Sequence, residues 1–340
     1  DYVSWTFRKA KKFFDVVTWS GNGVNGRTIS HNLGSVPGMI LVKRTDSADG
    51  WITYHRGMDA SSPEDYAMFL NLTNGRATET YWNNTAPTST GFTVSSNVKL
   101  NGSSGTYVAY VFAHNDSGDG GFGPDSDQDI IKCGSYAGNG TDARTIDLGF
   151  EAQWVLVKRS DGATDWWILD NMRGLHARQL SSNYLEANTS NAEASQGNFF
   201  ADSQGFMVDA GDYNSSGENY IYMAIRRGPL NEPDDATKVF AMSTRGATTP
   251  PPAWVSGFPV DFALETIVNG AGGFVTSSRL TSGYFLNTSS TGTETDYVHY
   301  TFDYNNGWSS MTGTNSNNQS WMWKRAPSYF DAVAYSGTGS

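Results

Sequence analysis

Residues 21–44 read GNGVNGRTISHNLGSVPGMILVKR, and residues 138–159 read GNGTDARTIDLGFEAQWVLVKR. The similarity continues as far as Tyr107 and Tyr220, and the offset between matching residues shrinks smoothly from 117 to 113. A duplicated domain that has lost a few residues gives this pattern. The chain is therefore predicted to be an array of related modules.

Two further matches extend the array. The segment PVDFAL at 259–264 lies 222 residues after PGMILV at 37–42, which indicates a third, more diverged copy. The two ends also match, because SWTFRKAKKFFD at 4–15 returns as SWMWKRAPSYFD at 320–331 with an offset of 316. Each end is therefore predicted to carry part of a module whose remainder lies elsewhere.

Short apolar and β-branched runs alternate with turns rich in Gly, Asn and Pro throughout the chain, and no segment has a helical period. Met39–Val42 is apolar on both faces, which predicts a central strand covered on each side. Several short strands at close spacing are typical of a sandwich. We expect an all-β fold of tandem antiparallel β-sandwich, jelly-roll-like modules.

The module boundaries follow from the repeats and from a linker rich in Gly and Asp. They are 1–12, the last strand of a preceding or neighbouring module; 13–116, module 1; 117–129, the linker; 130–233, module 2; 234–326, the diverged module 3; and 327–340, the first strand of a following module.

An interrupted module exposes unpaired strand edges, and each Å² of apolar surface left wet costs about 25 cal/mol. The sequence therefore predicts that the three-module unit repeats about every 316 residues in a longer chain. The alternative is that each end completes a module of a neighbouring subunit by strand addition.

Composition excludes several classes of function. The net charge of −11 argues against nucleic-acid and anionic-membrane partners, since both need clustered Lys and Arg. No apolar run is long enough for membrane insertion. The single cysteine, Cys133, lies in a strand-like run and is expected to be buried and unreactive. Only 17% of residues are charged, and this hydroxyl- and amide-rich composition is typical of an extracellular or virion protein.

Two groups of residues are candidate ligand sites. Asp125, Asp127 and Asp129 alternate like the start of a calcium loop, but the Gly and Glu that an EF-hand requires are missing, so a solvated linker is favoured. Trp51 and its neighbours Tyr54, His55 and Arg56 resemble a platform for a sugar ring, but the second copy keeps only Trp166, which favours core filling.

No motif indicates an enzyme. The five histidines lack metal-ligand spacing, and no nucleophile motif or phosphate loop is present. Acidic residues such as Glu186, Glu193 and Glu265 leave a glycosidase pair open, because carboxylate separation is a three-dimensional property. The pairs Lys43–Arg44 and Lys158–Arg159 are interpreted as salt-bridged strand ends. We expect no catalytic residues, no metal and no cofactor.

Six segments carry a resemblance to a known group of modules. The sequence resembles repeat modules of uncharacterised function in large structural proteins of tailed phages, especially marine and cyanobacterial ones. The segments are RTISHNLGSVPGMILVKRTDS (27–47), NLTNG (71–75), NNTAPTSTGFTV (83–94), NGSSGTYVAYVFAH (101–114), IIKCGSYAGNG (130–140) and NYIYMAIRRGP (219–229). The resemblance implies a tail fibre or tail-associated protein built from β-sandwich modules, and it implies no catalytic residues.

The sequence and the resemblance together favour a structural virion protein that contributes to recognition of a host-surface glycan. Expected partners are other virion subunits, that glycan and further copies of the chain, as a trimer by analogy with phage fibres. Two alternatives remain open. One is a glycan-degrading depolymerase of the virion, and the other is a cellular surface adhesin.

Overall fold

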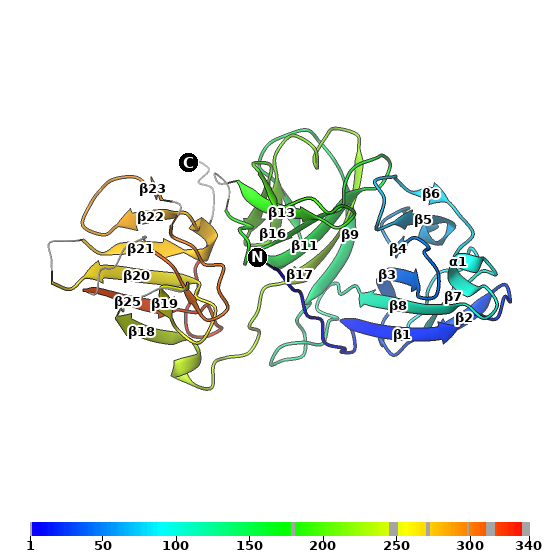
Figure 1. Ribbon diagram of the computed structural model, residues 1–340, viewed down its shortest axis with the longest axis horizontal. Coiled ribbons are helices and arrows are strands. Elements are labelled where there is room, and N and C mark those ends of the chain that lie inside the picture. Colours follow the sequence, from blue (N-terminus) through cyan, green and yellow to red (C-terminus); the bar gives the residue numbers. More distant parts are fainter. Residues whose placement is uncertain are drawn as a thin grey trace.

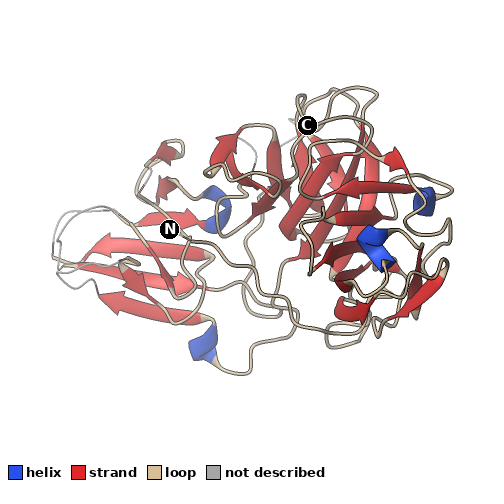
Figure 2. Cartoon of the chain, turned by 45° about the vertical axis from the view of Figure 1, so that its right-hand side comes forward, coloured by secondary structure: helices blue, strands red, loops and turns tan. Residues whose placement is uncertain are grey.

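The computed structural model describes residues 2–177, 181–244, 251–269, 273–297, 299–310 and 317–334. The all-β prediction is confirmed: 40% of the structure is strand and 4% is helix, in several antiparallel sheets. The helical parts are short turns between strands, as Figure 2 shows. Three six-stranded sheets follow one another along the chain (Figure 1).

The first sheet pair lies within residues 13–116, and its elements are β1 (Phe14–Ser20), β2 (Arg27–Ser30), β3 (Pro37–Arg44), β4 (Ile52–His55), η1 (Pro63–Asp65), β5 (Tyr66–Phe69), β6 (Ala77–Thr78), β7 (Gly91–Val94), α1 (Val98–Asn101) and β8 (Thr106–Ala113). A large sheet has the order β1-β8-β3-β4-β5-β6, and a small sheet pairs β2 with β7. The first strand of the module thus pairs with the last.

The second sheet pair lies within residues 130–233, and its strands are β9 (Ile131–Ala137), β10 (Arg144–Asp147), β11 (Ala152–Arg159), β12 (Trp167–Asp170), β13 (Ser182–Glu186), β14 (Ala194–Gln196), β15 (Phe199–Asp202), β16 (Gly205–Val208) and β17 (Asn219–Arg226). The large sheet has the order β9-β17-β11-β12-β13-β14, and the small sheet is β10-β16-β15. The order repeats that of module 1, with β15 added at one edge.

The third sheet pair lies within residues 234–326, and its elements are η2 (Ala236–Lys238), β18 (Phe240–Thr244), β19 (Trp254–Val255), β20 (Phe262–Ile267), β21 (Val275–Ser278), η3 (Arg279–Thr281), β22 (Tyr284–Asn287), β23 (Thr295–Asp296), β24 (Gly307–Trp308) and β25 (Asn318–Trp323). The large sheet has the order β18-β25-β20-β21-β22-β23, and the small sheet pairs β19 with β24. All three large sheets therefore share one strand order.

The prediction of a central, doubly covered strand at Met39–Val42 is confirmed. These residues lie in β3, between β8 and β4, and all four are buried. The small sheet covers the inner face of the large sheet: Trp19 of β1 stacks on Tyr107 of β8 and contacts Phe92 of β7. The other face, which we call the outer face, is not covered by the small sheet of its own module.

Face alternation corrects the sequence alignment of the third copy. The 222-residue offset pairs Val42 with Leu264, but Val42 lies opposite Ala109 on the inner face, whereas Ala263 is the residue of β20 that enters its module's core. Leu264 therefore lies on the outer face. A shift of one residue reverses the face of every side chain in a strand, and the short PVDFAL match could not fix the register.

Residues 2–9 form no strand within this chain, and the prediction that residues 1–12 are the last strand of a preceding or neighbouring module stays a prediction. Their counterparts in the 316-residue repeat, by contrast, form β25. The reason is pairing, since β25 is held between β18 and β20, and a strand needs such neighbours for its backbone groups. At the other end, residues 331–334 also form no strand, and 335–340 lie outside the described residues.

Candidate functional site

Modules 1 and 2 meet through the outer faces of their large sheets. Along β17, alternate residues divide between two cores: Tyr220, Tyr222 and Ala224 pack inside module 2, whereas Ile221 and Met223 pack with the residues of module 1. Successive side chains of a strand point to opposite faces, so β17 serves both cores. Figure 1 shows β9 and β17 beside the large sheet of module 1.

The outer-face residues of module 2 in this interface are apolar and buried, with exposed fractions between 0% and 8%: Ile131, Cys133, Trp154, Leu156, Ile221, Met223 and Ile225. Gly38 of β3 is needed for this close approach, because a Cβ there would lie 2.7 Å from the Cβ of Cys133. Burial also raises the pKa of the Cys133 thiol, which makes it a poor nucleophile. The prediction that this thiol is buried is confirmed.

Polar contacts fix the relative position of the two modules. His55 Nε2 lies 2.9 Å from the carbonyl oxygen of Tyr222, and burial lowers the pKa of His55 to about 3. The indole of Trp166 donates to the carbonyl of Phe69 at 3.1 Å. The amide of Arg76 donates to the carbonyl of Ser160 at 2.7 Å. These bonds satisfy polar groups that would otherwise be buried without partners.

The N-terminal segment closes one side of this interface. Phe7 packs against Phe14, Phe112 and Trp154, with ring centroids 5.5–6.2 Å apart. Trp5 donates a hydrogen bond of 3.0 Å to Asp170, and its ring lies under the guanidinium of Arg173. The aromatic residues that the sequence assigns to a missing module thus cover apolar surface of modules 1 and 2.

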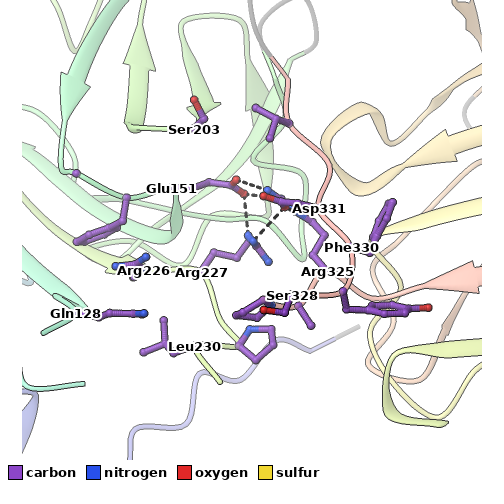
Figure 3. Close-up of a pocket in the computed structure, with 17 residues that line it drawn as sticks. Gln128, Glu151, Ser203, Arg226, Arg227, Leu230, Arg325, Ser328, Phe330 and Asp331 are labelled. Atoms are coloured by element: carbon purple, nitrogen blue, oxygen red, sulfur yellow. Dashed lines mark hydrogen bonds and ion pairs between the residues drawn. The ribbon is translucent and has the colours of Figure 1, made fainter. Parts of the chain in front are cut away.

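A charged cluster joins module 2 to the end of module 3, as Figure 3 shows. Arg325 is 3% exposed and donates two hydrogen bonds, of 2.9 and 2.7 Å, to the carboxylate of Glu151, and a third of 2.6 Å to Asp331. Arg227 lies 3.4 Å from Glu151 and 3.5 Å from Asp331. Bidentate pairs of this kind are strong and directional, so the cluster positions these parts of the chain.

The pKa shifts follow from burial and pairing. Burial lowers the pKa of Arg227, and the nearby charge of Arg325 adds to that effect. Burial also acts to lower the pKa of Arg325, but Glu151 and Asp331 more than offset it, and the pKa is raised. Both carboxylates are engaged by guanidinium groups, so neither is available as a general base.

A cavity of about 570 Å³ lies against this cluster. Besides the charged residues, Gln128, Ser203, Leu230, Tyr329 and Phe330 line it (Figure 3). The lining therefore places the rings of Tyr329 and Phe330 beside polar and charged groups.

The turn that leads into the cavity repeats at the other end of the chain. Ala326 bridges Phe330, and Ala10 bridges Phe14 in the same way. The pair Lys9–Asp15, at 2.8 Å, matches Arg325–Asp331, at 2.6 Å. The 316-residue sequence repeat is thus also a repeat of local structure.

The residues weighed as a sugar platform do not form one. Tyr54 is 3% exposed and packs against Trp82, and His55 is 1% exposed in the interface. Trp51 is half-buried and stacks on Tyr110, and Trp166 is 1% exposed. A sugar ring needs an open aromatic face, and these rings are used in packing.

The aspartates weighed as a calcium loop line a second groove, next to the cavity. Asp129 accepts hydrogen bonds from the amides of Gly118 and Gly120, at 3.1 and 3.0 Å. The side chain of Asn115 accepts a hydrogen bond from the amide of Ile130 at 3.0 Å. The Gly- and Asp-rich segment 117–129 is therefore held in place by its own polar groups. Among the described residues, no three His, Cys, Asp or Glu side chains are grouped to hold a metal ion.

The strand-end charges act alike in modules 1 and 2. Asp46 pairs with Arg44 at 2.8 Å and accepts a hydrogen bond from the amide of Thr106 at the start of β8. Asp161 pairs with Arg159 at 2.8 Å and accepts from the amide of Asn219 at the start of β17. The interpretation as salt-bridged strand ends is confirmed for the two arginines. It is wrong for the lysines: Lys43 donates to the carbonyl of Asp49, and Lys158 is buried and donates to the carbonyls of Arg159 and Gly162.

Sequence reasoning missed Glu151, Arg227 and Arg325 as a group, since they come from three distant segments. A signal was present: Arg325 and Asp331 lie inside the repeated end segment. The described residues contain no helix long and apolar enough to span a membrane.

Comparison with known proteins agrees with a unit built from modules 1 and 2. No curated protein and no solved structure matches the chain. One family matches residues 4–229, which is more than half of the chain and includes Trp5 and both packed modules. The chain therefore belongs to the family described as a domain of unknown function, DUF7483.

Proposed function

We propose that the chain is a structural virion protein of a tailed phage, in a tail fibre or another tail-associated part, and that it contributes to recognition of a host-surface glycan. The observation that carries the proposal is the interface of modules 1 and 2. Two outer sheet faces share one apolar core, with Ile131, Leu156 and Met223 at most 4% exposed. Such an interface makes two modules into one stiff body.

Two further observations support a structural role. The charged cluster beside the cavity is occupied by internal pairs, since Glu151 and Asp331 are engaged by Arg227 and Arg325. The composition of the chain is low in charge and rich in hydroxyls and amides. The resemblance to modules of tailed-phage structural proteins supports a location on the particle surface.

Antibodies against the chain test the structural role. Immunogold electron microscopy of particles from the phage that carries the gene is expected to label the tail. Label on the capsid alone, or on no part of intact and disrupted particles, would count against the proposal.

The glycan part of the proposal rests on the cavity. Tyr329 is 42% exposed and lines it together with Gln128 and Ser203, and an open ring beside polar groups suits a sugar. Binding of the chain to purified host surface polysaccharide is expected to weaken at least tenfold in Tyr329→Ala. The matched control is Tyr2→Ala, whose ring is fully exposed and is not part of the cavity lining. Equal binding by both variants would remove the glycan part and leave the structural part.

A further inference from the structure

The outer face of module 3 corresponds to the faces that modules 1 and 2 bury against each other. The three large sheets share one strand order, so corresponding rows of side chains can be read from the register of each. In module 2, one outer row runs from Cys133 through Met223 and Leu156 to Ile168. In module 3, the corresponding row runs through five strands: Met242, Trp321, Leu264, Thr276 and Leu286.

The two rows differ in exposure. In module 2, Cys133, Met223 and Leu156 are 1%, 2% and 4% exposed. In module 3, Met242 is 65% exposed and Leu286 is 46% exposed, while Trp321 and Leu264 on the two strands between them are half-buried. Phe274, whose ring lies 5.8 Å from that of Trp321, is 44% exposed. None of the outer-row residues is part of a buried core cluster in the described chain. Monomeric proteins rarely leave a contiguous apolar face of this kind in water.

A second outer row of module 3 is partly covered. It contains Phe240, Trp323 and Phe262, and Phe330 from the C-terminal segment packs on the last two, at 6.4 and 5.7 Å. This contact resembles the cover that Phe7 gives to Phe14 and Phe112 of module 1. One row is therefore covered from within the chain, whereas Met242 and Leu286 of the other row stay exposed among the described residues.

The outer face carries little charge. The outward residues of five strands, β18, β25, β20, β21 and β22, include no Asp, Glu, Lys or Arg. On the edge strand β23, Asp296 lies opposite Tyr284 of this face and is exposed. Around a two-fold axis each residue of a face meets the same face of the partner, so a strongly charged face would bring like charges together. An apolar face whose charge is confined to one edge strand can meet a copy of itself.

We infer that the outer face of module 3 binds the same face of a second copy of the chain, in a two-fold dimer. The packing of modules 1 and 2 is the precedent within the molecule, since there two related outer faces pack on each other, with β9 in contact with β3 and β8. This inference does not depend on the phage location, and it differs from the trimer expected by analogy, because two sheet faces form a closed pair.

Sedimentation of the full chain tests the dimer. At micromolar concentration the mass is expected to be about twice 37.0 kDa. Met242→Asp and, separately, Leu286→Asp are expected to raise the dissociation constant at least 100-fold, because each places a charge in a dehydrated interface. Both side chains are exposed in one copy of the chain, so the thermal midpoint of the monomer is expected to stay unchanged.

Val255→Asp is the matched control. Val255 lies in β19 on the small sheet and is 57% exposed, so this variant is expected to dimerise like the parent. A parent that sediments as a monomer or a trimer overturns the inference. So does a dimer that tolerates both charges in the Met242 row, or one that Val255→Asp weakens equally. If a variant does not fold, the sedimentation mass of the parent chain alone decides whether it is a dimer.

Discussion

Truncation of Met223 tests whether modules 1 and 2 form one body. Met223 lies in β17, is 2% exposed, and packs with the core residues of module 1. Replacing a buried Met by Ala leaves a cavity and costs about 3 kcal/mol, within the range of about 2–5 kcal/mol for such changes. Since about 1.4 kcal/mol changes the equilibrium constant for unfolding by a factor of ten, amides that exchange only when the whole unit opens should exchange about 100-fold faster.

Hydrogen exchange followed by mass spectrometry locates the effect. In Met223→Ala, we expect faster exchange in β3 and β8 of module 1 as well as in β11 and β17 of module 2. The matched control is Met207→Ala in β16 of the small sheet, which makes the same truncation outside the interface core. It is expected to affect β10 and β15 most and module 1 less. Faster exchange confined to module 2 in Met223→Ala would refute the shared core.

Three further predictions concern the junctions. His55 has a pKa of about 3 in the folded chain, below the ordinary 6.5, so its contribution to the free energy of unfolding is complete above pH 6.5 and is lost by about 1.4 kcal/mol per pH unit as the pH falls toward 3. Urea midpoints between pH 7 and 4.5 should therefore fall less steeply in His55→Gln than in the parent, and equal slopes would contradict this. Glu151→Gln leaves two buried guanidinium groups with a weaker partner, so it should lower the free energy of unfolding by about 3 kcal/mol and lower the thermal midpoint. The control Glu232→Gln changes an exposed carboxylate and should alter the midpoint little; an equal effect of the two variants would argue against the cluster. Gly38→Val forces the sheets apart at Cys133, so the thiol should react with a thiol reagent, and a thiol as unreactive as in the parent would refute the close approach.

Sequence reasoning reached the fold class and the order of modules because local signals were strong. The repeat of GNG…RTI…LVKR and the apolar run Met39–Val42 depend on neighbouring residues, which pattern reading detects. Register in module 3 was missed by one residue, since the short match around Leu264 carries no information on which face is buried.

The junctions could not be predicted from the sequence. Whether His55 is open or buried depends on module 2 packing over it, and Glu151 meets Arg325 across 174 residues of chain. The end segment shows the limit most clearly. Trp5 and Phe7 share a pattern with β25, but a strand forms only where neighbouring strands are present.

The central claim is that this chain is a structural part of a phage particle. Mass spectrometry of particles purified by density gradient, from the phage whose genome carries the gene, tests it most directly. The account predicts peptides from all three modules, in a stoichiometric amount that stays with the tail when tails and capsids are separated. Peptides present in the infected-cell lysate and absent from the purified particles would contradict it.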